Sequence, residues 1–146
     1  MKRKDLHDTR IDEKIVLSGL RTSMLFVFAY VDIFAFWRAD VIEGALAGTV
    51  PGAGLRIDQT FLALTTVYIA IPSLMIVASL IMPAKINRTA NLVVGLVYFA
   101  SIVVTLVGET WVYYIVGSVV ELVLLLGLLR VAWSWRGARS GLPAGR

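Results

Sequence analysis

The chain contains no cysteine and only one histidine, His7. Without cysteine it can form neither disulfides nor thiolate metal sites, so iron–sulfur clusters and thiol redox relays are excluded. A single histidine cannot provide both axial ligands of a bis-histidine haem, and a zinc site made only of carboxylates would be unusual. We therefore expect no cofactor and no bound metal.

Charged residues are also scarce, because they make up 16% of the chain while hydrophobic residues make up 58%. Soluble domains are about 45 to 50% apolar and about one quarter charged. The net charge is +4, but the basic residues flank apolar runs and form no patch, so nucleic acid is not an expected partner. The mean hydropathy of +0.81 indicates an integral membrane protein whose surroundings are the lipid bilayer.

The apolar residues are gathered into runs long enough to cross a membrane. A hydrocarbon core about 30 Å thick requires roughly 20 helical residues, and the runs lack the alternation typical of membrane β-strands. The sequence predicts an all-α fold, an integral membrane four-helix bundle between cytoplasmic tails at residues 1–16 and 136–146. Within the transmembrane domain, residues 17–135, the expected helices are 17–37, 61–82, 90–108 and 111–133.

Short connections predict that successive helices pack antiparallel. Pro83 is expected to end the second helix, and the polar residues after it form a turn in which Asn87 or Thr89 caps the third helix. The third and fourth helices are joined by a tight hairpin at "GET".

The connection between the first two helices, residues 38–60, is the longest. Asp40 is expected to cap a short interfacial helix that Gly48 ends, and Asp58 to cap the second span. This segment reads either as a structured connector or as a lid over the bundle.

Twelve of the fourteen Lys and Arg residues lie on the side of the bundle that holds both termini. Only Arg38 and Arg56 lie on the opposite side. The excess of positive charge predicts that both termini are cytoplasmic. The "ALA" at residues 45–47 resembles a signal-peptidase site, but it lies well beyond the apolar run, so we expect the first helix to be retained.

Polar side chains recur at helical spacing in the outer half of the spans, and two of them are acidic. A carboxyl group deep in a bilayer costs about 2.5 to 3.5 kcal/mol, and such residues usually face the bundle interior or a wet cavity. We predict one outward-opening pocket that binds a proton, a cation or a hydrogen-bonding ligand. Its predicted residues are Asp32, Glu121, Thr65, Tyr68, Tyr98, Ser101 and Ser118.

The alternative interpretation of these residues is structural. Small residues and hydroxyls let membrane helices approach or bond their own backbone, and each carboxyl could be protonated and fix the register of a neighbouring helix. The only basic partners expected near the carboxyls are Arg38 and Arg56. The cytoplasmic half is expected to have almost no matching polar groups, with Arg21 snorkelling to the near interface.

At these positions the chain resembles a family of small bacterial four-helix membrane proteins known only as a domain of unknown function. Asp32 and Glu121 match its acidic positions, whereas Ile71 stands before Pro72 where the family pattern has an acidic residue. The resemblance implies a bacterial plasma-membrane location and supports the fold without naming an activity. A weaker likeness to DoxX-type proteins is architectural. The segments that carry the family resemblance are "AYVDIFAF", "IDQTFLALTTVYIAIPSLMIVASLI", "INRTANLVVG" and "YYIVGSVVELVLLLGLLRVAWSW".

Two functions fit the sequence. The first is binding or transport of a small ligand or proton through the polar pocket, in which transport by so few helices would require a homo-oligomer. The second is a structural or accessory subunit that meets a membrane-protein partner and has no ligand of its own. An enzyme is not favoured, because the sequence shows no nucleophile with an adjacent base and no phosphate-binding loop.

Overall fold

The computed structural model describes residues 11–135, so the predictions for the two tails fall largely outside the described residues. This part of the chain folds into four long apolar helices and one short helix between the first two, which confirms the predicted all-α architecture. The helices are α1 (Glu13–Ala35), α2 (Ala39–Leu46), α3 (Gln59–Ile81), α4 (Ala84–Thr105) and α5 (Val112–Ser134).

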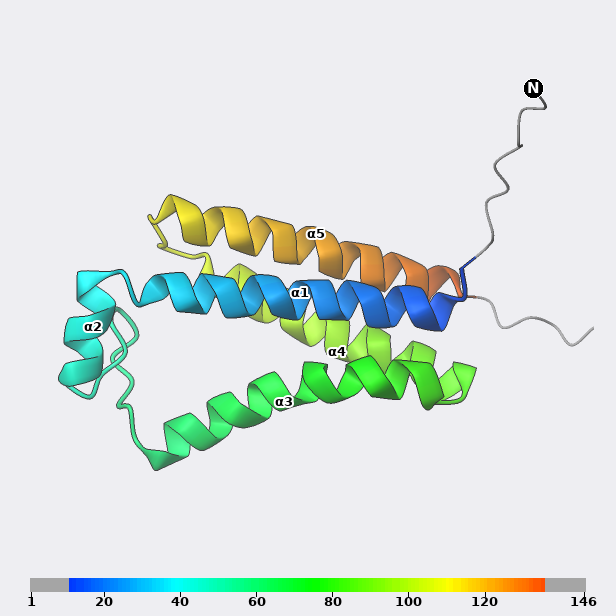
Figure 1. Cartoon of the computed structure of the whole chain (residues 1–146), viewed down its shortest axis with the longest axis horizontal. Coiled ribbons are helices and arrows are strands. Elements are labelled where there is room, and N and C mark those ends of the chain that lie inside the picture. Colours follow the sequence, from blue (N-terminus) through cyan, green and yellow to red (C-terminus); the bar gives the residue numbers. More distant parts are fainter. Residues whose placement is uncertain (1–10, 136–146) are drawn as a thin grey trace, which may run out of the picture.

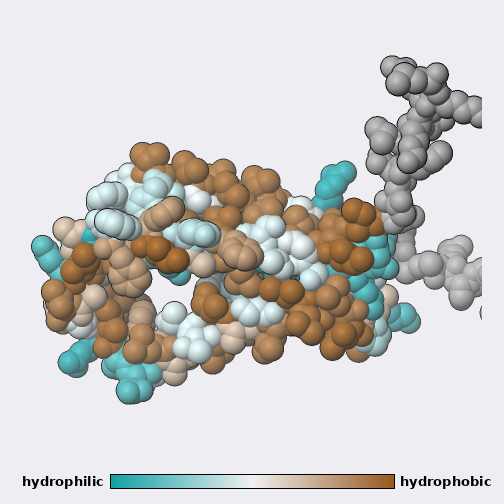
Figure 2. Space-filling view, in the orientation of Figure 1, coloured by the Kyte–Doolittle hydropathy of each residue, from teal (hydrophilic) through white to brown (hydrophobic). Residues whose placement is uncertain are grey.

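The four long helices contain 22 or 23 residues each and are apolar enough to be candidate membrane spans. At 1.5 Å per residue they are about 33 Å long, which matches the thickness of a hydrocarbon core. Figure 2 shows apolar surface over much of the molecule, with hydrophilic side chains gathered at its two ends. The protein is therefore a multi-pass membrane protein.

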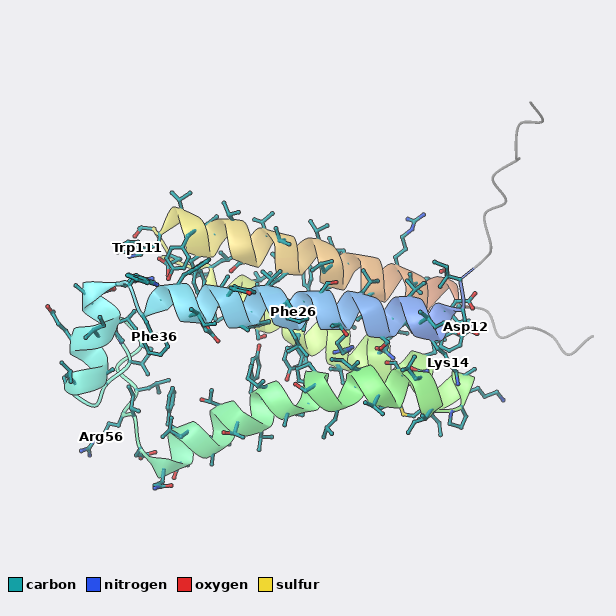
Figure 3. All side chains as sticks on the ribbon, viewed as in Figure 1. Asp12, Lys14, Phe26, Phe36, Arg56 and Trp111 are labelled. Carbon is teal, nitrogen blue, oxygen red and sulfur yellow. The ribbon has the colours of Figure 1, made fainter. Side chains whose placement is uncertain are left out.

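The long helices form a ring in chain order. Helix α1 packs against α5 and α3, and α4 packs against α5 and α3. Figure 1 shows that α2 lies at one end of the bundle, which we call the loop end, while α1 begins and α5 ends at the opposite, terminal end. In Figure 3, Trp111 and Arg56 mark the loop end, and Asp12 and Lys14 mark the terminal end.

The ends of α3 and α4 test two of the predicted caps. Asp58 caps α3 as predicted, because its carboxylate accepts a hydrogen bond of 2.9 Å from the backbone N–H of Phe61. The predicted cap of α4 is wrong. Helix α4 begins at Ala84, directly after Pro83, which occupies the N-cap position and separates α4 from α3 because it lacks the N–H that a continuous helix requires. Asn87 and Thr89 therefore lie within the helix.

Helix α2 confirms the short helix predicted in the first connection. Gly48 follows its C-terminus with a positive φ of 71°, a conformation that glycine adopts without steric cost. The predicted Asp40 cap is wrong, since Arg38 occupies the cap position and makes no side-chain cap bond. Asp40 lies in the first turn, where a negative charge interacts favourably with the positive end of the helix dipole.

Pro72 lies inside α3 and shapes the loop end of the bundle. Proline lacks an N–H, so it leaves the carbonyl of Tyr68, four residues earlier, without its helical donor. That carbonyl accepts a hydrogen bond from the hydroxyl of Tyr98 on α4. Figure 1 shows α3 bent about half-way along and running away from α1 towards the loop end. The bend opens space between the helices at that end.

Apolar packing closes the rest of the bundle. One buried cluster contains Met24, Tyr98, Ile102 and Leu125, and a second cluster nearer the terminal end contains Leu17, Leu128 and Ala132. At the loop end α1 and α5 approach closely at Gly117. A Cβ atom added there would lie 2.3 Å from Val31 Cγ2. Glycine therefore permits the contact that brings the two acid-bearing helices together.

Candidate functional site

A cavity of about 460 Å³ lies between the long helices in the loop-end half of the bundle. We call it the carboxyl pocket, because both Asp32 of α1 and Glu121 of α5 line it. Three of the predicted hydroxyl residues, Tyr68, Ser101 and Ser118, line it as well. The remaining lining residues are Phe28, Val31, Leu55, Phe61, Ile102, Thr105 and Tyr114. The pocket thus combines two acids, several hydroxyls and an apolar wall, and none of its lining residues in the described part of the chain is basic.

Glu121 is the most enclosed acid of the pocket. Its side chain is only 3% exposed, and among the described residues no group hydrogen-bonds to its Oε1 atom. A buried polar atom without a partner is unfavourable by about 1 to 3 kcal/mol, more if it is charged. Glu121 is therefore a group that a proton or a ligand inside the cavity would stabilise.

Asp32 occupies a different environment. It is exposed in the isolated chain and lies in the last turn of α1, which ends at Ala35. The C-terminus of a helix carries a partial negative charge, so a carboxylate there is unfavourable and a nearby cation is favourable. Asp32 and Glu121 line the same cavity, so the two carboxylates would repel each other if both were ionised. A shared proton or cation would relieve that repulsion.

The pocket hydroxyls form a chain between α3 and α4. Ser101 Oγ donates to the Tyr98 carbonyl at 2.8 Å, and it lies 2.6 Å from the hydroxyl of Tyr68. Because Ser101 uses its one hydrogen on that carbonyl, Tyr68 is the donor in the second bond. The Tyr68 oxygen then accepts no hydrogen bond from any described residue and can accept one from a protonated carboxyl or a bound molecule.

Two predicted site residues lie outside the lining. Thr65 is on an exposed face of α3, and its hydroxyl donates to the Phe61 carbonyl of its own helix. Tyr98 lies beneath the pocket, where it is 2% exposed and bonds the carbonyl freed by Pro72. Ile71, at the position where the resemblance suggested an acid, is 42% exposed and does not line the cavity. Because position 71 lies outside the pocket wall, an isoleucine there in place of an acid does not change the wall.

The connection between α2 and α3 reaches the pocket through Leu55, which lines it together with Phe61 near the start of α3. Figure 2 shows the surface hollowed between α1 and α3 close to α2. The first connection therefore contributes to the wall of the cavity near its opening. The interpretation of this connection as a lid stays a prediction.

A charged cluster lies at the loop end beside the pocket. Arg38 binds Asp40 through two hydrogen bonds of 2.6 and 3.1 Å and contacts Glu109 at 3.4 Å. Its guanidinium carbon also lies 4.6 Å from the ring centre of Trp111, a favourable cation–π geometry. Arg38, one of the two basic residues considered as partners for the pocket carboxyls, is thus paired with Asp40 and Glu109.

These contacts change the acidity of the groups outside the spans. Hydrogen bonds from Arg38 lower the pKa of Asp40, and the same bonds raise the pKa of Arg38. Partial burial disfavours ionisation of Glu109, but the backbone N–H groups of Trp111 and Thr110 and the charge of Arg38 together lower the pKa of its carboxyl. All of these groups are therefore ionised at neutral pH.

A second polar cluster lies in the terminal-end half, where the sequence had predicted almost none. Arg21 is completely buried and does not snorkel. Its Nη2 donates to Asn91 Oδ1 at 3.0 Å, Asn91 Nδ2 donates to Asn87 Oδ1 at 2.7 Å and to Ser79 Oγ at 3.1 Å, and Asn87 Nδ2 donates to the Ser79 carbonyl. We call Arg21, Ser79, Asn87 and Asn91 the Arg21 cluster.

The Arg21 cluster is incomplete as a hydrogen-bond network. Within residues 11–135, the Nε and Nη1 atoms of Arg21 have no partner, and no ion pair joins Arg21 to an acid. The sequence signal was present, since Asn87 and Asn91 are four residues apart and share a helix face. It was missed because the third helix was expected to begin at Ala90, which placed Asn87 in a turn.

Neither the carboxyl pocket nor the Arg21 cluster forms a recognisable metal site among the described residues. Within the part of the chain that the structure describes, no group of three or more His, Asp or Glu side chains could hold a metal ion. The chemistry available in the carboxyl pocket is proton exchange and hydrogen bonding by two acids and their hydroxyl neighbours.

Comparison with known proteins gives a family and no activity. Residues 1–140 match the model of a family described as "Family of unknown function (DUF6326)". No curated protein and no solved structure gives a significant match. Since the match covers nearly the whole chain, this four-helix membrane protein with an acid-lined pocket belongs to the family of unknown function DUF6326.

Proposed function

We propose that the protein binds a proton or a small cationic or hydrogen-bonding ligand in the carboxyl pocket, as a step in transport or sensing across the membrane. The observation that carries this proposal is Glu121, a buried acid whose Oε1 has no partner in the described chain and which faces the same cavity as Asp32. Acids inside a membrane usually mark ion or proton pathways.

The chemistry of the lining favours a proton or a cation over an anion. Asp32 and Glu121 provide negative charge, the hydroxyls of Tyr68 and Ser101 provide hydrogen bonds, and no Lys or Arg between residues 11 and 135 lines the pocket. Its volume of about 460 Å³ is that of a site for a small molecule. The apolar wall would exclude large hydrated anions.

The proposed orientation in the membrane puts the pocket on the outer side. Among the described basic residues, Lys14, Arg21, Lys85, Arg88 and Arg130 belong to the terminal-end half, and only Arg38 and Arg56 to the loop end. The positive-inside rule then assigns the terminal end to the cytoplasm. The location that goes with this orientation is a bacterial plasma membrane.

A second function, that of a structural or accessory subunit, is favoured by a separate observation. The hydroxyls of Tyr68 and Tyr98 bond across α3 and α4, as polar groups do when they hold membrane helices together. In that case the two carboxyls would be neutral and would bind no ligand, and the protein would act through a membrane partner.

Infrared spectroscopy of the carboxyl groups in liposomes separates the two functions. We expect at least one carboxyl band to change between about pH 4 and pH 9, and the part of this change that comes from the pocket to be reduced in Glu121→Gln. Bands that are constant over this range in the unmodified protein would contradict proton binding. Glu43→Gln is the matched control, because Glu43 is exposed on α2, outside the pocket.

Function and stability must be measured on the same variants. We expect Glu121→Gln and Asp32→Asn to keep the thermal stability of the protein and to lose proton uptake or flux into liposomes. If either variant instead loses stability or assembly without a change in flux, the accessory-subunit function is supported.

A further inference from the structure

The terminal end of the bundle carries a basic cavity on the side opposite to the carboxyl pocket along the helix axes. This cavity has a volume of about 630 Å³ and lies between the first turns of α4 and the end of α5. Lys85, Arg88 and Thr89 provide its polar lining, and Trp135 forms a wall. No acidic residue lines it within the described chain, so the cavity is suited to an anion.

Arg88 has hydrogen-bonding capacity left over in this cavity. Its Nη2 donates to the Trp133 carbonyl at 3.3 Å, while its buried Nε has no partner among residues 11–135. A guanidinium presents several donors in a plane that fits the oxygens of a phosphate. The contact to Trp133 holds Arg88 in place and leaves the other donors for a ligand.

The basic cavity continues into an apolar groove. Leu92 lines both the basic cavity and a neighbouring hollow of about 710 Å³ between α4 and α5. The walls of this groove include Leu96, Leu126 and Leu129, with Arg130 and Trp133 beside them. Leu96 is 57% exposed in the isolated chain, so the groove is open on the side that would face lipid.

The length of this combined site matches one leaflet of a bilayer. From Lys85 to Leu96 the helical rise amounts to about 16 Å, close to half of a hydrocarbon core about 30 Å thick. A basic head site that leads into an apolar channel of this length has the chemistry and the dimensions of a phospholipid. Tryptophan at the same level is typical of the membrane interface.

We propose that Lys85, Arg88 and the groove lined by Leu92, Leu96 and Leu129 bind one anionic phospholipid of the leaflet at the terminal end. The phosphate contacts Lys85 and Arg88, and one acyl chain lies along the groove between α4 and α5. This site is independent of the carboxyl pocket, because the two share no lining residue, and its failure would leave the proposed function untouched.

The test is a lipid titration of the purified full-length protein in detergent, followed by native mass spectrometry. We expect phosphatidylglycerol to bind with one tight site and phosphatidylcholine to bind more weakly. A basic residue near an anionic membrane surface contributes enough that Lys85→Gln or Arg88→Gln should each weaken phosphatidylglycerol binding about fivefold. Arg88→Gln loses a contact to α5 and could fail to fold. Lys85 is exposed, so Lys85→Gln should fold and keeps the test decisive.

Two further variants separate the head site from general charge and from the groove. Arg56→Gln removes the same charge at the loop end and should leave lipid binding unchanged. Leu96→Trp keeps the charge but fills the groove, and should weaken the binding of both lipids.

Four outcomes would overturn the proposal. Equal losses in Arg56→Gln and Lys85→Gln would show long-range charge attraction only, and equal affinity for both lipids would show acyl-chain binding only. Displacement by inorganic phosphate would indicate a site for a free anion. A dimer that Leu96→Trp dissociates, without bound lipid, would assign the groove to a second copy of this chain.

Discussion

The two halves of the bundle treat polar groups in opposite ways. In the terminal-end half, the Arg21 cluster joins α1, α3 and α4 by direct hydrogen bonds, and the helices are close. In the loop-end half, α3 diverges beyond Pro72 (Figure 1) and leaves Glu121 facing a cavity. The terminal-end half is therefore a closed half, in which hydrogen bonds join the helices directly. The loop-end half is an open half, in which the same helices surround an accessible polar pocket. Polar residues in a membrane bundle can therefore have two different roles, since some join helices and others line a cavity.

Substitution of Asn91 should have the largest effect on stability, because it removes hydrogen bonds that hold the closed half together. Asn91→Leu leaves the buried Arg21 without its described acceptor, and we expect the free energy of unfolding to fall by about 3 kcal/mol. Reversible unfolding in detergent measures the loss. The double variant Arg21→Met with Asn91→Leu should recover much of it, since it removes both polar groups. A double variant that is even less stable would show that Arg21 is stabilised by other contacts.

Gly117 tests the close approach of α1 and α5 in the open half. Gly117→Ala puts a methyl group against Val31 and should lower the free energy of unfolding by about 2 kcal/mol. Gly127→Ala, ten positions along the same helix, meets Leu20 at an ordinary 3.8 Å and should be neutral or slightly stabilising. Thermal melts of both variants make the comparison, and Val31→Ala should rescue only Gly117→Ala.

The bend at Pro72 should control access to the open half without a large effect on stability. Pro72→Ala restores an N–H that competes with Tyr98 for the Tyr68 carbonyl, so we expect a straighter α3 and a narrower pocket. Because the chain has no cysteine, Ser101→Cys gives a single reporter for thiol labelling, and Pro72→Ala should slow its labelling several-fold. Ser79→Cys, in the closed half, should label slowly in both backgrounds.

The charged cluster around Arg38 should give the smallest effect. The lowered pKa values of Asp40 and Glu109 contribute stability that is complete above the ordinary pKa of each carboxyl and is lost as the pH falls through the lowered value. The melting temperature should therefore drop between about pH 5 and pH 3. Arg38→Gln should flatten this drop, and an identical slope in both proteins would contradict the assignment.

The fold was predictable from the sequence because each span is predominantly apolar and of membrane length. Glu121, Ser118 and Ser101 line one cavity, since polar residues at helical spacing on α4 and α5 share one face. Thr65 lies outside the lining, and the sequence does not show this because α3 is apolar on all sides, so its inward face cannot be read from hydrophobic periodicity.

The Arg21 cluster shows where sequence reasoning fails for membrane helices. A basic residue one or two turns from a helix end is expected to reach the interface, and only the position of Asn91 on a neighbouring helix explains why Arg21 stays inside. Such a contact joins residues 70 positions apart and leaves no local pattern. Pairs of this kind become visible only in three dimensions.

The separation of Arg21 and Asn91 along the chain also has a consequence for biogenesis. At a synthesis rate of about 5 to 20 residues per second, α1, which ends at Ala35, is complete roughly 3 to 11 s before Asn91 has been made. During this interval the guanidinium of Arg21 lacks its native acceptor. The first helix must therefore be held by the insertion machinery, by lipid head groups or by water until α4 arrives, and the order of synthesis becomes part of the folding mechanism.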